Sequence, residues 1–450
     1  MKKLLLPLSL ILALSLSSCV KSAADVSESE NSQPQTDAAE SAEPIEDANA
    51  EEIPPEEENN SENDNSSSAD IDSIISSMSL HEKICQMIIT TPETLTGYGV
   101  QTEWDDFTTV CYEAFPVGGL ILFDPNIESS TQLSKFVSDL HSMTDATGID
   151  VFMGVDEEGG EIARLQQKLG TDPVSPMSYY GDTNSYDEAY AAGQAIGNEL
   201  AEYGFNLDFA PVADVNINPA NELGSRIFSS DPQIVADMSA AVIDGLHSCG
   251  VCTTLKHFPG LGAGDGNTHD GAVYIERTLE ELEETEFKAF KGGIDAGTDF
   301  VMVGHQTTSA SGENLQGDLS HVVVTDWLRD KLGYDGIIIT DSHSMGAVIN
   351  SLSSGDSAIM AVQAGVDMIL MPYDIVDAVT SLEKAVESGE ISEDRINDSI
   401  RRILTKKKSM SILSQPKPQT EKSEEVTESE EIEEVTEPES EETAESEETE

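Results

Sequence analysis

Residues 336–341 read Gly-Ile-Ile-Ile-Thr-Asp, a short apolar run that ends in an acid. We interpret the run as a buried strand and Asp341 as the first residue after it. An aspartate at the end of a strand is held rigidly, which suits a residue that takes part in chemistry. The rest of the chain decides what kind of sheet this strand belongs to.

The same arrangement recurs between about residues 71 and 415. Short apolar runs predict eight strands, at 84–90, 117–123, 151–155, 205–209, 251–256, 300–304, 336–340 and 366–371. Periodic stretches between them predict helices, among them 130–141, 186–203, 232–247, 278–296 and 356–364. Strands that alternate with helices pair in parallel through crossovers, so eight such units predict an α/β fold, a closed (β/α)8 barrel. A doubly wound sheet is the alternative, but it would leave the eightfold count unexplained.

Polar or glycine-rich segments follow five of the predicted strands. They contain Asp156, Asp214, Lys256, His305 and Asp341. One polar residue after a strand is often only a helix cap. In a barrel, however, all five segments lie on the rim where the βα loops build the active site. The sequence therefore predicts a functional site at this rim.

Five motifs in order resemble glycoside hydrolase family 3, in particular its single-barrel branch related to bacterial N-acetyl-β-glucosaminidases. The motifs are residues 79–87, 156–160 with Arg164, 224–228, 256–260 (Lys-His-Phe-Pro-Gly) and 334–345. The resemblance runs from about residue 71 to the basic helix at 395–408. It implies a TIM-like barrel and a retaining mechanism on β-linked sugars.

The resemblance also implies roles for individual residues. Asp341 is expected to attack the anomeric carbon and form a glycosyl-enzyme. The residues expected to hold the sugar hydroxyls are Asp156, Arg226, Lys256 and His257. Charged hydrogen bonds of this kind orient the ring and can strengthen in the transition state. His257 has an alternative interpretation as a structural histidine packed beside the rim.

The loop after the Lys-His-Phe-Pro-Gly segment departs from the family pattern. In the single-barrel branch, the general acid/base is the histidine of an Asp-Ser-His triplet on this loop. Residues 267–269 here read Asn-Thr-His, so the resemblance assigns the role to His269, with Asn267 in place of the aspartate. An imidazole exchanges protons near neutral pH, and a neighbouring carboxylate would favour its charged form. We expect Asn267 to fix the ring tautomer, and we hypothesise that Asp265 or Asp270 supplies the missing charge.

Three functions follow from this pattern. The first is a retaining β-glycosidase that hydrolyses terminal β-N-acetylglucosaminides from cell-wall or chitin-type fragments. The second is a family member with another β-glycoside substrate or a phosphorolytic activity. The third is a surface carbohydrate-binding lipoprotein without catalysis. Retention of both Asp341 and His269 favours the active alternatives, because a binding protein needs neither a nucleophile nor an acid.

Composition excludes other classes of function. The chain has 86 Asp and Glu against 23 Lys and Arg, and residues 71–415 keep 54 acidic residues against 18 basic ones. Nucleic acid is therefore not expected as a partner, because phosphates need basic residues. The eight histidines show no metal-ligand spacing, and no glycine-rich loop has a phosphate-binding pattern. We expect neither a metal nor a cofactor.

The two ends of the chain differ in composition from residues 71–415. Residues 1–18 have a basic start and an apolar run typical of a secretory signal peptide. The small residues before Cys19 resemble the bacterial lipobox, in which the cysteine carries the lipid. Residues 19–70 and 416–450 are acidic and poor in apolar residues, which predicts a disordered tether and a disordered tail. Together these features predict an extracytoplasmic lipoprotein anchored to the bacterial cell membrane.

Overall fold

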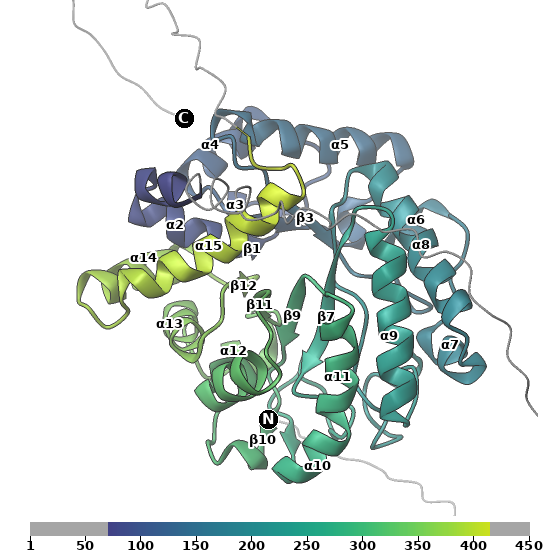
Figure 1. Ribbon diagram of the computed structural model, residues 1–450. Coiled ribbons are helices and arrows are strands. Elements are labelled where there is room, and N and C mark those ends of the chain that lie inside the picture. Colours follow the sequence, from purple (N-terminus) through teal and green to yellow (C-terminus); the bar gives the residue numbers. More distant parts are fainter. Residues whose placement is uncertain (1–70, 415–450) are drawn as a thin grey trace, which may run out of the picture. The chain divides into compact units, whose positions relative to one another are not determined.

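The computed structural model describes residues 71–414, shown in colour in Figure 1. The predicted signal peptide, the predicted lipidation site Cys19, and both predicted acidic tails lie outside the described residues, so they stay predictions. Among residues 71–414, no helix is long and apolar enough to cross a membrane.

Eight parallel strands form the core of the fold, as the sequence predicts (Figure 1). They are β1 (Ile88–Thr90), β2 (Gly119–Ile121), β3 (Phe152–Val155), β6 (Leu207–Asp208), β7 (Cys252–Phe258), β9 (Phe300–Val303), β11 (Ile337–Thr340) and β12 (Ile369–Leu370). Their order in the sheet is β11-β9-β7-β6-β3-β2-β1-β12. A parallel bridge between Ile339 and Met368 joins the two ends of this order and closes the ring. The predicted (β/α)8 barrel is confirmed.

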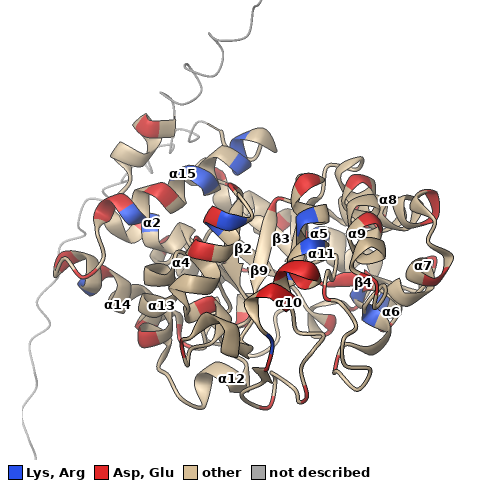
Figure 2. Ribbon diagram, turned by 60° about the horizontal axis from the view of Figure 1, so that its bottom comes forward, with Lys and Arg blue, Asp and Glu red and all other residues tan. Residues whose placement is uncertain are grey.

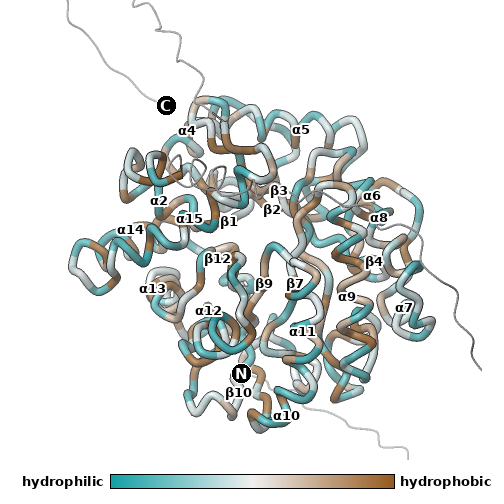
Figure 3. Tube along the Cα trace, in the orientation of Figure 1, coloured by the Kyte–Doolittle hydropathy of each residue, from teal (hydrophilic) through white to brown (hydrophobic). Residues whose placement is uncertain are grey.

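Helices surround the strands. They are α2 (Leu80–Gln86), α3 (Pro92–Thr96), α4 (Asp106–Ala114), α5 (Ser130–Ser142), α6 (Arg164–Leu169), α7 (Met177–Thr183), α8 (Tyr186–Tyr203), α9 (Pro232–His247), α10 (Leu279–Glu284), α11 (Glu286–Asp295), the π-helix η6 (Val322–Lys331), α12 (Gly346–Ile349), α13 (Ser354–Ala364), α14 (Ile375–Glu387) and α15 (Glu393–Ser409). Along α9, hydrophobic and hydrophilic positions alternate, because one face packs on the barrel (Figure 3). Acidic residues occur on outer helices such as α10 (Figure 2).

Two short sheets sit on the βα loops. Strands β4 (Glu157–Gly159) and β5 (Ile162–Ala163) form an antiparallel pair directly after β3. Strands β8 (Tyr274–Ile275) and β10 (Thr307–Thr308) pair in parallel. Both pairs stiffen loops that carry residues of the rim.

Two predicted elements differ from the structure. Residues 84–86 belong to α2 rather than to the first strand, because a capping box between Ser79 and Glu82 starts a helix that runs to Gln86. The predicted helix 278–296 is interrupted at Thr285, which leaves the helical conformation. The break turns Glu286 inward, where its carboxylate pairs with Arg277 at 3.0 Å.

Lys407, on α15, is fully buried at the N-terminal end of the barrel. Its Nζ donates to Gln86 Oε1 at 2.8 Å and lies 5.0 Å from the centre of the Phe152 ring. Burial lowers the pKa of Lys407 to about 7, because the charged amine loses its hydration there. At pH 7, protonated and neutral forms of Lys407 are therefore present in similar amounts.

Replacing Lys407 with Met is expected to change how stability depends on pH. In the unfolded chain a lysine ionises near pH 10.4, so above pH 7 the unfolded state binds more protons and the wild-type stability rises with pH. From pH 7 to pH 9, the wild type should gain roughly 2–3 kcal/mol that Lys407→Met does not gain. Urea unfolding of both chains at the two pH values measures this difference. An equal change in the free energy of unfolding of both chains would contradict the lowered pKa of Lys407.

Candidate active site

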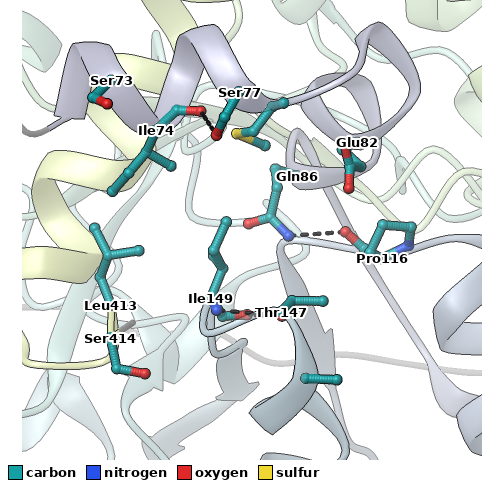
Figure 4. A pocket seen from close by; sticks show the side chains of 12 residues that line it. Ser73, Ile74, Ser77, Glu82, Gln86, Pro116, Thr147, Ile149, Leu413 and Ser414 are labelled. Carbon is teal, nitrogen blue, oxygen red and sulfur yellow. Dashed lines mark hydrogen bonds between the residues drawn. The ribbon is translucent and has the colours of Figure 1, made fainter. Parts of the chain in front are cut away.

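Two cavities of similar size lie at opposite ends of the barrel. One, of about 520 Å³, lies at the N-terminal end beside Ile74, Gln86 and Ile149 (Figure 4). Its Gln86 donates to the carbonyl of Pro116 at 2.8 Å, and Glu82 is the only charged residue that lines it among residues 71–414. The other, of about 570 Å³, lies at the carboxyl ends of the strands and collects many ionisable side chains. The chemistry of the second cavity makes it the candidate active site, as the barrel fold leads us to expect.

The carboxyl-end cavity contains every candidate catalytic and binding residue that the sequence predicts. Its lining includes Asp156, Arg226, Lys256, His257, Asn267, His269 and Asp341. Lys256 and His257 belong to the end of β7 itself, and the others lie in the loops that follow β3, β6, β7 and β11. The barrel therefore brings together side chains that the sequence could only place at the same rim, while their catalytic roles stay predictions.

Asp341 sits directly after β11, as predicted. Its backbone N–H donates to the carbonyl of Val303 at 2.9 Å, and its Oδ1 accepts from the Ser342 N–H at 2.7 Å. Burial alone would raise the pKa of Asp341, but the charges of His305 and His257 outweigh burial and lower it. The carboxylate is therefore ionised and fixed in direction, as a nucleophile must be.

A charged cluster lies beside this carboxylate. Lys256 Nζ donates to Asp156 Oδ1 at 2.8 Å and to Glu158 Oε1 at 2.7 Å. Arg226 donates two hydrogen bonds to the Glu158 carboxylate, of 2.7 and 2.8 Å. Burial would raise the pKa of Glu158, but Lys256 and Arg226 lower it to about 2. Glu158 thus fixes both cations as rigid donors facing the cavity.

His257 combines both interpretations that the sequence left open. Its Nδ1 lies 2.7 Å from Asp214 Oδ2, and its backbone N–H donates to the same oxygen at 3.1 Å. Asp214 is completely buried, so this contact is structural. The contact with Asp214 engages Nδ1, which leaves Nε2 of the cavity-lining ring for a ligand.

Asn267 contacts the backbone of the loop that carries His269. Asn267 Oδ1 accepts from the backbone N–H of His269 at 2.8 Å, so it braces the loop. Asp265 and Asp270 are exposed, and among residues 71–414 neither hydrogen-bonds the His269 ring. The amide oxygen forms a short Asx-type turn with the backbone, and the tautomer-fixing role of Asn267 stays a prediction.

The His269 loop is nevertheless held in place. Gly346 N donates to the carbonyl of His269 at 3.1 Å, and Ala347 N donates to the carbonyl of Thr268 at 3.2 Å. Glu222 Oε1 accepts from both the N–H and the hydroxyl of Thr268, each at 3.2 Å. The loop is thus tied to α12, which begins five residues after the nucleophile. The imidazole is exposed at the edge of the same cavity.

Sequence reasoning missed three kinds of site residue. Glu158 lies in the motif at residues 156–160, but the sequence pattern did not predict a role for it. An acid two residues after Asp156 could have suggested an ion pair. Glu222 gave no signal, because nothing in its neighbourhood marks a contact with Thr268. Asp318 and His343 also gave none, since each is one polar residue in a loop. All become visible only through contacts between distant loops.

No resident metal site is evident in this region. Among residues 71–414, no group of three or more His, Cys, Asp or Glu side chains is arranged to hold a metal ion. The site as described consists of carboxylates, imidazoles and fixed cations.

The fold and the site define a (β/α)8-barrel protein with an ionised carboxylate and an imidazole in a charged cavity at the carboxyl ends of the strands. The sequence profile described as "Glycosyl hydrolase family 3 N terminal domain" matches residues 79–406. The chain belongs to glycosyl hydrolase family 3.

Relatives and solved structures of the same family are similar along most of the barrel. A beta-hexosaminidase of Nitrosomonas eutropha is 32% identical over 291 residues, which cover 62% of this chain and 82% of the relative. Beta-hexosaminidase A of Pseudoalteromonas piscicida is 28% identical over 315 residues, covering 64% and 53%. The chain thus spans about half the length of the Pseudoalteromonas protein.

Among solved structures, a family 3 β-N-acetylglucosaminidase from Paenibacillus superposes with a TM-score of 0.70 at 31% identity. This match covers 75% of this chain and 63% of that one. A β-N-acetylhexosaminidase from Beutenbergia cavernae gives a TM-score of 0.66 at 28% identity, over 74% and 99% of the two chains.

Proposed function

We propose that this protein is a retaining glycosidase that hydrolyses terminal β-N-acetylglucosaminides. The observation that carries the proposal is the pairing, in one cavity, of an ionised Asp341 with the imidazole of His269. The names of the family relatives, beta-hexosaminidase and β-N-acetylglucosaminidase, support the choice of sugar.

In the first step of the proposed reaction, Asp341 attacks the anomeric carbon and the glycosidic bond breaks. His269 gives its proton to the departing oxygen, so the aglycone leaves as a neutral alcohol. The product of this step is a glycosyl ester of Asp341. In the second step, His269 accepts a proton from water, and the resulting hydroxide attacks the same carbon and releases Asp341. Two inversions leave the sugar with its original β-configuration.

The charged cluster supplies binding and orientation. Lys256 and Arg226 offer fixed donors to sugar hydroxyls, and Asp156 offers an acceptor. The ion pairs of the two cations with Glu158 remove the freedom of their long side chains. A preorganised cluster loses little entropy when the sugar binds, and its hydrogen bonds gain strength as charge develops on the ring.

The proposal extends to substrate source and location. Cell-wall or chitin-type fragments fit an enzyme that is exported and anchored to a bacterial membrane through a lipid on Cys19. The basic start, apolar run and cysteine of residues 1–19 support this location. Fractionation of cells that produce the full chain, with the membrane pellet probed for the protein, tests it.

Substrate preference tests the proposed activity. We expect the purified protein to release nitrophenol from an aryl β-N-acetylglucosaminide at least tenfold faster than from an aryl β-glucoside, because the relatives similar to this chain are named beta-hexosaminidase and β-N-acetylglucosaminidase. Added phosphate should not change the rate, and free N-acetylglucosamine should be the product. Release that requires phosphate and yields a sugar 1-phosphate would replace hydrolysis with phosphorolysis. Sugar binding without release from either substrate would show a binding protein.

A further inference from the structure

Behind the nucleophile lies a cluster of three buried side chains, His305, Asp318 and His343. His305 follows β9 by two residues, Asp318 lies in the turn Gly317–Leu319, and His343 lies two residues after Asp341. Their side chains have no exposed surface. None of them lines the carboxyl-end cavity, so the proposed reaction does not use them directly.

The hydrogen bonds of His305 define its charge. Nδ1 lies 3.1 Å from Asp318 Oδ1, and Nε2 lies 2.9 Å from the carbonyl oxygen of Ser342. A carbonyl and an ionised carboxylate can only accept hydrogen bonds. Both ring nitrogens must therefore carry a proton, which makes His305 an imidazolium.

The other half of the cluster stabilises this charge. The second oxygen of Asp318 lies 2.9 Å from His343 Nε2, and His343 Nδ1 lies 3.1 Å from the Ser357 hydroxyl. Asp318 is thus fixed between two rings, and its negative charge lies beside the positive charge of His305, as buried charges require.

Ser342 connects the cluster to the nucleophile. Its N–H donates to Asp341 Oδ1 at 2.7 Å, while its carbonyl accepts from His305 at 2.9 Å. The two ends of one residue are thus fixed between the nucleophile and the buried imidazole. The His343 backbone N–H also donates to the carbonyl of Leu370 at 2.9 Å, which fixes the next peptide of the loop.

We propose that His305 is a permanently charged positioning residue which, held by Asp318 and His343, aims the Asp341 carboxylate and keeps it ionised. This inference rests on the proposed function for the role of Asp341. His305 faces the charges of Asp318 and Asp341, whereas Asp341 is also faced by His257 and Lys256. The cavity holds further carboxylates at Asp156 and Glu158, and their negative charge would oppose ionisation of the nucleophile without such compensation.

The pKa values agree with the geometry. Burial would lower the pKa of His305, but Asp318 outweighs burial and raises it to about 9. Burial would raise the pKa of Asp318, but His305 lowers it to about 2. His305 thus stays charged through the neutral range.

Nitrogen NMR of the wild-type protein with labelled histidines measures the charge of His305 without any enzymatic assay. The expected result is a ring with two protonated nitrogens at pH 7, assigned by the loss of its signals in His305→Gln. A neutral His305 at pH 7 would overturn the inference. This readout needs no turnover, so a protein inactive on both sugars would contradict the proposed function while the charge of His305 was still decided.

The second experiment replaces Asp318 with Asn, which keeps the shape and removes the charge. The acid limb of the kcat/KM profile should move to higher pH by about one unit, and kcat should fall about tenfold with little change in KM, because the substrate contacts stay in place. Asp299→Asn is the matched control. It breaks another buried pair, His247 Nε2 to Asp299 Oδ2 at 2.8 Å, at the opposite end of the barrel.

We expect the control to lower thermal stability and leave the acid limb unmoved. An acid limb that stayed in place in a folded Asp318→Asn protein would overturn the inference. If that variant did not fold, the NMR result on the wild type would still decide between a charged and a neutral His305.

Discussion

Replacing Asp341 with Asn is expected to lower kcat for aryl β-N-acetylglucosaminide hydrolysis by a factor on the order of 10⁴ or more, as removal of a catalytic nucleophile commonly does. The neutral amide cannot form the glycosyl ester. The substitution keeps the size of the side chain, so the contact of Asp341 Oδ1 with the Ser342 N–H can persist and the fold should be retained. Steady-state rates, with circular dichroism as a check on folding, measure the effect.

Asp335→Asn provides the matched control for this experiment. Asp335 is exposed and lies just before β11, at the opposite end of the same strand. The same chemical change there should leave the rate unchanged within about twofold, as expected for surface substitutions away from a site. Mass spectrometry of the wild type with a slow fluorinated substrate should show a covalent sugar, and Asp341→Asn should show none. An adduct on another residue would contradict the assignment of the nucleophile.

The second large effect is expected for His269→Ala. Loss of a general acid/base costs roughly 10²- to 10⁴-fold in rate. The loss should be greatest for substrates with poor leaving groups, because a good leaving group departs without a proton. Added azide should restore turnover of an activated aryl substrate by attacking the glycosyl-enzyme in place of activated water, and a β-glycosyl azide should form.

The control is His321→Ala, which removes an exposed histidine at the start of η6. Its rate should match that of the wild type with every leaving group. A His269→Ala protein whose loss was the same for good and poor leaving groups would show that His269 binds substrate and is not the proton donor. Glu222 would then be the next candidate, because its carboxylate lines the cavity and already contacts the same loop.

The sequence predicted the rim of the site because of a property of parallel barrels. All strands point the same way, so residues that follow different strands meet at one end whatever lies between them. Asp156 and Lys256 are 100 positions apart in the chain, yet their side chains lie 2.8 Å apart. Neither residue needs a special neighbour in sequence for this contact; each only has to lie at the carboxyl end of its strand, Asp156 just after β3 and Lys256 near the end of β7.

The partners of the site residues could not be predicted in the same way. The expectation that Asn267 orients the His269 ring came from a triplet pattern, and the structure gives its oxygen to a backbone N–H two residues on. Local turns compete with side-chain contacts, and the backbone conformation of the loop decides which one forms. Similarly, the break at Thr285 interrupts a stretch with good helical periodicity, because a buried contact between Glu286 and Arg277 replaces a continuous helix.

The sequence by itself determined the barrel, because apolar runs and helical periodicity repeat along the chain. It also determined the end of the barrel at which the site lies, because Asp341 directly follows its strand. Only the tertiary structure decided that Glu158 fixes two cations and that His305, Asp318 and His343 form one buried cluster. These contacts depend on distances between loops, and the charges that they bring together outweigh burial and set the ionisation of each group. The ionised state of Asp341 belongs to this second kind of information, because it follows from the groups that surround the carboxylate and not from the residues that precede it.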